Sequence, residues 1–343
     1  MKNKFNTILY ATTGRLKLPV VAFFLYRNVR EQKKYIQKHL LPDLDNFQGN
    51  NDGSLNTADF EKITNYYAVG VPAVIGYGFS ILRGVPLSNK ERSCMTYQGG
   101  ISGLLDDLFD EPEKEVLHLE GFIRNPEDLT PINNYESLLK HFYVSGLKNS
   151  ENKNALKKQA EKVFNTEKES NLQLSKELLF ENIKELTFLK GGHSFLFYRL
   201  CLANTLGEAE KKMIYQLGGL MQMGNDIFDV WEDSQSGIET MATKSNNIKD
   251  LRKSFTDELE KAIEAVTKCS YPKKQLQAFT RINLLGLSRV YVCLDQFEKL
   301  QAPEDLIFQP EKYSRKQLIC DMEQPKNKKA AIKYYLRLHS KFL

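Results

Sequence analysis

Apolar residues recur three and four positions apart along most of the chain, a spacing typical of amphipathic helices. The clearest segments are Phe180–Leu206, Glu208–Asp233, Leu251–Val266 and Leu276–Leu300. No stretch alternates strictly between apolar and polar positions, so we expect no large sheet. Proline and glycine fall mainly between the helical segments. The pattern predicts an all-α fold in which residues 1–343 form one domain of long antiparallel helices.

Three stretches differ in composition from these helical segments. Residues 45–56 and 148–171 are rich in Asn, Asp, Lys and Glu, and we expect both to be polar surface loops. For residues 148–171 the alternative is a partly helical segment whose charged side chains cover its outer face. Residues 303–343 read as a basic C-terminal tail that contains tyrosines. The apolar run Leu18–Tyr26 is too short to span a bilayer, so no integral membrane segment is predicted.

Charge and cysteine content narrow the function classes. The net charge is +5, from 48 basic and 43 acidic residues, and a nucleic-acid-binding surface would need a stronger basic excess. Five scattered cysteines, with no CxxC pair, argue against a structural zinc site and a disulfide framework. The odd number suits a reducing compartment, so we expect a soluble cytoplasmic protein that does not bind nucleic acid.

The first candidate for chemistry is an acidic cluster, Asp106-Asp107-Leu108-Phe109-Asp110. On a helix, Asp106 and Asp110 lie one turn apart with Asp107 beside them. Carboxylates this close repel one another unless cations lie between them, and Mg²⁺ prefers oxygen ligands. A solvated acidic helix end is the alternative, because this spacing also arises by chance.

The second candidate is a row of oxygen-bearing side chains in an apolar segment. Asn225, Asp229 and Asp233 stand at i, i+4 and i+8 and would share one helix face. Their neighbours include Phe228 and Trp231, and burying carboxylates among such residues is costly without a counter-ion. The row therefore predicts a second binding site for divalent cations.

Together the two clusters resemble the motifs of class I isoprenoid synthases, the superfamily of terpene synthases and their prenyltransferase relatives. Residues 106–110 are similar to the first aspartate-rich motif, DDxxD. Residues 225–233 are similar to the terpene-synthase motif NDxx(S/T)xxxE, with Asp229 replacing the hydroxyl residue and Asp233 replacing Glu. Gln222 and the residues after it also resemble the FQxxDDxxD box of chain-elongating prenyltransferases, with Asn225 in place of the first Asp. About 120 residues separate the clusters, as suits two facing helices.

The resemblance implies a helical bundle around a central cavity and a prenyl diphosphate substrate. Mg²⁺, expected as three ions and replaceable by Mn²⁺, would be held by the two clusters. Cationic or polar contacts to the diphosphate are expected from Lys190, Lys244 and Gln222. The expected cavity-wall residues are Phe195, Tyr198 and Phe228. A homodimer is also compatible with the resemblance.

Two further expectations concern the helix that carries Lys190. The Gly191-Gly192 pair that follows it predicts either a helix break facing the cavity or a turn between two helices. We expect Arg199 to face solvent.

Three functions remain open on these residues. The first is a Mg²⁺-dependent terpene synthase, which ionises a linear prenyl diphosphate and then cyclises the cation or eliminates a proton. The second is a condensing enzyme of the squalene or phytoene synthase type, since Asp106 and Asp110 satisfy DxxxD, or a chain-elongating prenyltransferase. Elongation is disfavoured because residues 111–115, Glu-Pro-Glu-Lys-Glu, stand where an arginine pair is usual. The third is a non-catalytic helical protein that binds an isoprenoid.

Overall fold

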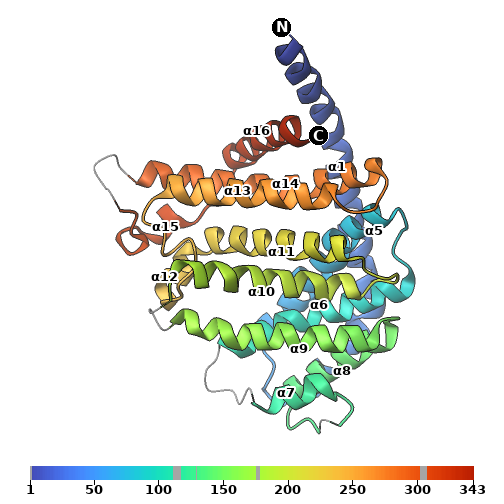
Figure 1. The fold of residues 1–343 in the computed structure, drawn as a ribbon. Coiled ribbons are helices and arrows are strands. Elements are labelled where there is room, and N and C mark those ends of the chain that lie inside the picture. Colours follow the sequence, from blue (N-terminus) through green and yellow to red (C-terminus); the bar gives the residue numbers. More distant parts are fainter. Residues whose placement is uncertain (1, 111–116, 129, 175–177, 302–306) are drawn as a thin grey trace. The chain divides into compact units, whose positions relative to one another are not determined.

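The fold is built from helices alone in the residues that the structure describes. These residues, taken from a computed structural model, are 2–110, 117–128, 130–174, 178–301 and 307–343 (Figure 1). The predicted all-α class is confirmed. The helices of the first half are α1 (Lys2–His39), α2 (Leu41–Gly49), α3 (Thr57–Glu61), α4 (Ala68–Gly70), α5 (Tyr77–Arg83), α6 (Asn89–Asp110), α7 (Leu117–Arg124), α8 (Asn134–Asn149) and α9 (Lys153–Ser170), with π-helices η1 (Lys62–Tyr67) and η2 (Val71–Gly76).

The described second half of the chain contains five long helices and two short ones. They are α10 (Phe180–Leu200), α11 (Glu208–Phe228), α12 (Val230–Ser236), α13 (Ile248–Thr267), α14 (Lys273–Leu300), α15 (Arg315–Leu318) and α16 (Pro325–Phe342), with 3₁₀ turns η3 (Asn171–Leu174) and η4 (Pro310–Lys312). The four helical segments predicted from periodicity correspond to α10, α11 with α12, α13 and α14. The expected segment 180–206 is shorter as a helix, because α10 ends at Leu200.

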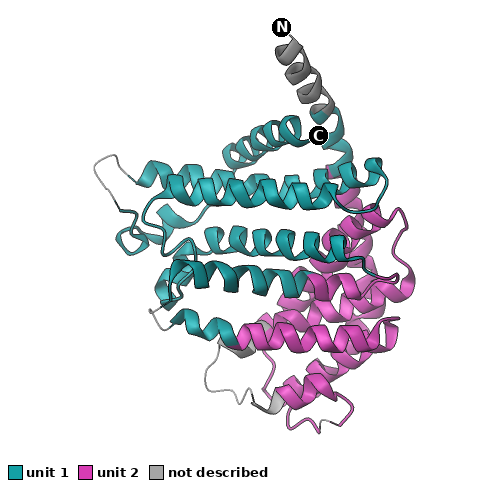
Figure 2. Cartoon of the chain, in the orientation of Figure 1, with its two compact units in different colours: residues 1–21, 169–195, 206–343 teal, residues 22–168, 196–205 magenta. Residues whose placement is uncertain are grey.

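The chain divides into two compact units, coloured separately in Figure 2. Unit 1 comprises residues 1–21, 169–195 and 206–343, and unit 2 comprises residues 22–168 and 196–205. The single domain over residues 1–343 stays a prediction.

Unit 1 is organised around α11, α13 and α14. α11 packs on α13 and on α14, and α14 also packs on α16. On α13, the side chains of Leu251, Phe255, Leu259 and Val266 are buried, with spacings of four and seven residues. Because these side chains share one face, burial of that apolar stripe holds α13 against its neighbours.

Unit 2 is organised around α6, which packs on α8 and on the π-helices η1 and η2. A Cβ at Gly99 would lie 2.8 Å from the carbonyl oxygen of Tyr67, and one at Gly103 would lie 2.7 Å from the ring of Tyr67. The glycines therefore allow the two helical segments to approach closely.

Unit 2 also buries an ion pair. Arg83 donates from Nη1 to Glu91 at 2.6 Å, and the side chains of both residues are less than a tenth exposed. The same Glu91 carboxylate accepts the backbone N–H of Ala203 at 2.8 Å. These hydrogen bonds, led by that from Arg83, hold the pKa of Glu91 below its usual value despite its burial.

Three stretches of polar or basic composition contain helices. Residues 153–170 form α9, as in the partly helical alternative for residues 148–171, because Leu156, Ala160 and Phe164 repeat every four residues and are buried. Residues 325–342 of the expected tail form α16, which packs on α14. Of the expected loop 45–56, residues 45–49 belong to α2.

Arg199 is buried, whereas we expected it to face solvent. Its guanidinium lies 5.9 Å from the ring centre of Phe79, and Nη1 donates to the carbonyl oxygen of Ala203 at 3.5 Å. A cation–π contact and a carbonyl partner make this burial tolerable. Within the described part of the chain, no helix is both long and apolar enough to cross a membrane.

Candidate functional site

The site that the sequence predicts around residues 222–233 begins with a close contact between α10 and α11. A Cβ at Gly191 would lie 2.1 Å from the carbonyl oxygen of Gly218, and one at Gly219 would lie 2.3 Å from the ring of Phe188. Real side chains do not tolerate such distances, so only glycine fits at this crossing. The contact fixes the spacing of the two helices that carry the predicted residues.

The expected helix break at Gly191-Gly192 is wrong, and so is the alternative of a turn. α10 continues through both glycines to Leu200. The intrinsic cost of glycine in a helix is of the order of 1 kcal/mol per residue. Here that cost is offset by packing, because a Cβ at Gly192 would overlap the ring of Tyr215, 2.3 Å away.

The predicted row Asn225, Asp229 and Asp233 is distributed over two helices. α11 ends at Phe228 and α12 begins at Val230, so the single helix that we expected is interrupted at Asp229. The Asn225 amide donates to the Asp229 carboxylate at 2.6 Å. Aspartate is a poor interior helix residue because its side chain competes for such local hydrogen bonds.

The interruption does not disperse the row. The Asp229 N–H donates to the Asn225 carbonyl oxygen, and the Asp233 N–H donates to the Asp229 carbonyl oxygen, both at 2.9 Å. These bonds keep the i to i+4 spacing of a helix across the junction. The three oxygen-bearing residues therefore still follow one another at intervals of one turn.

Asp226 is the most buried carboxylate of this region. Its side chain accepts a hydrogen bond from Gln222 at 2.9 Å and one from the Thr187 hydroxyl at 3.3 Å. Burial raises the pKa of Asp226 to about 6, and the hydrogen bond from Gln222 and the charge of Lys190 oppose that rise. Gln222 thus contacts a carboxylate of the second cluster directly.

The pKa of Asp233 is raised further than that of Asp226. Burial raises the pKa of Asp233 to about 8, and the neighbouring charges of Asp226 and Asp229 raise it further. The positive charge of Lys190 acts in the opposite direction and lowers the pKa of both Asp226 and Asp233.

The donor set fits a hard divalent cation in type but is not preformed. Asp229, Asp233 and the Asn225 amide oxygen are the oxygen ligands that Mg²⁺ prefers. Among the described side chains, no three His, Cys, Asp or Glu residues converge as a ready metal site. The Asn225 amide donates to Asp229, so cation binding would require that amide to turn its oxygen toward the ion.

The first cluster occupies the C-terminal end of a different helix. Asp106, Asp107 and Asp110 lie in the last turns of α6, which belongs to unit 2. The predicted helical spacing of the three is confirmed by the backbone. Their side chains lie outside the described part of the structure.

Lys244, the other predicted diphosphate contact, is exposed and pairs with Glu239 at 2.6 Å. The Cβ of Phe195, a predicted wall residue, would lie 2.8 Å from a Cβ built at Gly218, so it packs into the helix crossing. Tyr198 is buried in unit 2 and donates to the Ser102 hydroxyl at 2.8 Å. Phe228 lies beneath the exposed Arg289 guanidinium, 5.6 Å from its ring centre.

The sequence did not indicate Thr187 as a site residue, nor that Asp226 is a buried carboxylate that accepts hydrogen bonds from Thr187 and Gln222. Thr187 stands three residues before Lys190, one turn earlier on α10, which is the only sequence signal that points to it. The contact of Arg289 with the ring of Phe228 is a further one that nothing local in α14 indicates.

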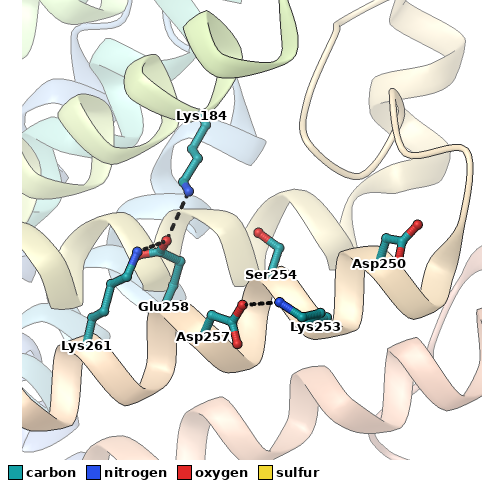
Figure 3. A pocket seen from close by; sticks show the side chains of 7 residues that line it. All are labelled: Lys184, Asp250, Lys253, Ser254, Asp257, Glu258 and Lys261. Atoms are coloured by element: carbon teal, nitrogen blue, oxygen red, sulfur yellow. Dashed lines mark hydrogen bonds and ion pairs between the residues drawn. The ribbon is translucent and has the colours of Figure 1, made fainter.

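A pocket of about 210 Å³ opens elsewhere in unit 1, and none of the predicted site residues lines it. Figure 3 shows the side chains that line it, namely Lys184, Asp250, Lys253, Ser254, Asp257, Glu258 and Lys261. Lys184 and Lys261 donate to Glu258 at 3.0 and 2.9 Å, and Lys253 donates to Asp257 at 2.8 Å. Lys184 and Lys261 share Glu258, and Asp250 adds a third carboxylate to the lining. Positive and negative side chains are therefore equal in number, and the pocket does not offer the positive surface that a phosphate group needs.

Neither protein-family models nor curated protein sequences match this chain. The resemblance to class I isoprenoid synthases therefore rests on the two short clusters and the helical pattern.

Proposed function

We propose that this protein is a Mg²⁺-dependent class I terpene synthase that ionises a linear prenyl diphosphate. The allylic cation then cyclises or loses a proton, and diphosphate is released. The observation that carries the proposal is the geometry at the junction of α11 and α12, where Asn225, Asp229 and Asp233 follow one another at intervals of one helical turn and the carboxylate of Asp226 is buried. Such a cluster gains free energy when a cation binds, because the cation removes the repulsion between the carboxylates.

In this proposal Asn225, Asp229 and Asp233 are ligands of Mg²⁺, and Asp106, Asp107 and Asp110 are the second expected set of Mg²⁺ ligands. Bound Mg²⁺ supplies positive charge to the departing diphosphate oxygens. Lys190 adds a further positive charge beside the second cluster. Lys244 would reach the diphosphate only after leaving Glu239.

Two neighbouring residues position this machinery. Gln222 and Thr187 both donate to Asp226 and so fix the carboxylate that stands between α10 and the row. The glycine crossing of Gly191 and Gly218 sets the distance between the helices that carry Lys190 and Asp233. Aromatic side chains such as Phe228 would stabilise the cation through their ring faces.

The test is diphosphate release from geranyl, farnesyl, geranylgeranyl and geranylfarnesyl diphosphates, with Mg²⁺ or with EDTA, followed by mass spectrometry of an organic extract. We expect metal-dependent release and a hydrocarbon or alcohol product. Asn225→Ala, Asp107→Ala and Lys190→Ala should each lower the rate by about a hundredfold, as loss of one transition-state contact typically does. The matched control is Glu232→Gln, because Glu232 is an exposed neighbour of the row that pairs with Arg315 at 3.6 Å.

Other outcomes distinguish the alternatives. Release only when two prenyl substrates are supplied together would identify a condensing enzyme. No release from any substrate by a folded protein would contradict the synthase and favour an isoprenoid-binding protein.

A further inference from the structure

The outer face of helix α1 carries large apolar side chains in water. Phe23 is 59% exposed and Tyr26 is 68% exposed. Leu16 and Val20, further back on the same helix, are 69% and 48% exposed. Positions 16, 20, 23 and 26 fall on one side of a helix, so the four side chains form a continuous stripe.

The opposite face of α1 is anchored, which fixes the direction of the stripe. Gln32 is buried and donates through Nε2 to the Ala68 carbonyl oxygen at 2.9 Å and to the Thr96 hydroxyl at 2.8 Å. Ile36, four residues later, is 3% exposed. Because one face of α1 is committed to α4 and α6 of unit 2, the other face is held outward.

Basic side chains continue the same outer face. Arg27, Arg30 and Lys34 are exposed and follow the apolar stripe at helical spacing. Between residues 16 and 39 the sequence holds six Lys or Arg residues and one acidic residue, Glu31. Glu31 pairs with Arg27 at 3.4 Å, which leaves a strong positive excess on this helix.

We propose that the outer face of α1 docks this protein on an anionic lipid surface. The stripe from Leu16 to Tyr26 would enter the boundary between headgroups and acyl chains, while Arg27, Arg30 and Lys34 face the headgroups. Aromatic and aliphatic side chains next to basic residues are the composition of helices that lie in this interface. Each basic residue near an anionic membrane adds to the attraction.

Charge argues against a second copy of the chain as the occupant. Parallel pairing of two α1 helices through this face would bring two basic rows together, and like charges at such distances repel. An anionic membrane supplies both the apolar layer and the opposite charge. The inference does not depend on the proposed enzymatic function.

The test is co-sedimentation of the full chain with vesicles of phosphatidylcholine alone and of phosphatidylcholine mixed with phosphatidylglycerol. We expect binding to the mixed vesicles, at least tenfold weaker binding to the neutral vesicles, and release by added salt. Phe23→Ser combined with Tyr26→Ser should weaken binding by tenfold or more. Arg30→Glu combined with Lys34→Glu should do the same.

Matched controls lie elsewhere in unit 2. Tyr66 is 68% exposed, like Tyr26, and Tyr66→Ser should bind as the wild type does. Lys153→Glu combined with Lys158→Glu changes two exposed charges on α9 and should also bind nearly as the wild type does. Circular dichroism of each variant checks that the helices are retained.

The proposal would be overturned by no binding of the wild type to mixed vesicles, by equal binding to both vesicle types, or by unchanged binding of the Arg30 and Lys34 variant. A dimer in sedimentation equilibrium that dissociates on Phe23→Ser and Tyr26→Ser would overturn it in favour of self-association. If the Phe23 and Tyr26 variant does not fold, the Arg30 and Lys34 variant still tests whether this face of α1 binds anionic vesicles.

Discussion

The contact between Gly191 and Gly218 makes a sharp prediction about stability. In Gly191→Ala the new Cβ would lie 2.1 Å from the Gly218 carbonyl oxygen and 2.8 Å from the Gln222 Cβ. Ordinary contact begins near 3.4 Å, so the groups must separate by more than 1 Å. The obstacle is backbone, which cannot rotate away as a side-chain end can. The helices themselves must therefore move apart.

The magnitude follows from two opposing effects. Overpacking a tight core typically lowers the free energy of unfolding by about 1–3 kcal/mol. We expect a value near the upper end of this range here, because the overlap is with backbone atoms. Replacing glycine by alanine inside a helix raises the free energy of unfolding by about 1 kcal/mol, because alanine has the higher helix propensity. We therefore expect Gly191→Ala to lower the free energy of unfolding by about 2 kcal/mol.

Gly286→Ala is the matched control, because Gly286 is an exposed glycine inside α14 and nothing lies within 4 Å of its missing Cβ. This variant should gain about 0.5–1 kcal/mol, since only the propensity effect acts. Urea unfolding followed by circular dichroism measures both. If Gly191→Ala is as stable as Gly286→Ala, the account of the α10–α11 crossing is refuted.

Three other predictions concern individual charges. The folded-state pKa of Asp233, about 8, lies above the ordinary 3.8, so its contribution to stability is complete at low pH and is lost as the pH rises to about 8. Without metal, the melting temperature should therefore fall over that range in the wild type and fall less in Asp233→Asn; an equal fall in both would contradict this cause. Glu91→Gln, which breaks the buried pair with Arg83, should lower the free energy of unfolding by about 3 kcal/mol, and a loss below about 1 kcal/mol would show that the pair contributes little. Lys244→Ala should lower diphosphate release less than Lys190→Ala does, because Lys244 already pairs with Glu239.

Periodicity alone predicted the long helices, since the burial of α13 and α14 follows directly from their apolar spacing. For α9 a helix was only the alternative to a loop, because Lys, Asn and Glu residues surround Leu156 and Phe164. The C-terminal helix α16 was missed for a similar reason, because its basic composition suggests a solvated tail.

The remaining differences come from contacts between segments far apart in the sequence. Gly191 and Gly192 have the local preference of a helix break, and only their packing against Gly218 and Tyr215 explains why α10 continues. Arg199 looks like a surface residue until Phe79 and Ala203 are beside it. No local pattern reveals such partners.

The same holds for the candidate site. The order of Asn225, Asp229 and Asp233 could be predicted from spacing, whereas the hydrogen bond from Thr187 to Asp226 could not. The raised pKa of Asp233 likewise depends on how deeply the junction of α11 and α12 is buried.

The central claim is that the junction of α11 and α12 is a divalent-cation site that holds a diphosphate. The most direct measurement is calorimetric titration of the protein with inorganic diphosphate, in Mg²⁺ and in EDTA. We predict binding only with Mg²⁺, lost in Asp229→Asn and retained in Glu232→Gln. Equal binding in EDTA, or no binding in either buffer, would contradict the claim.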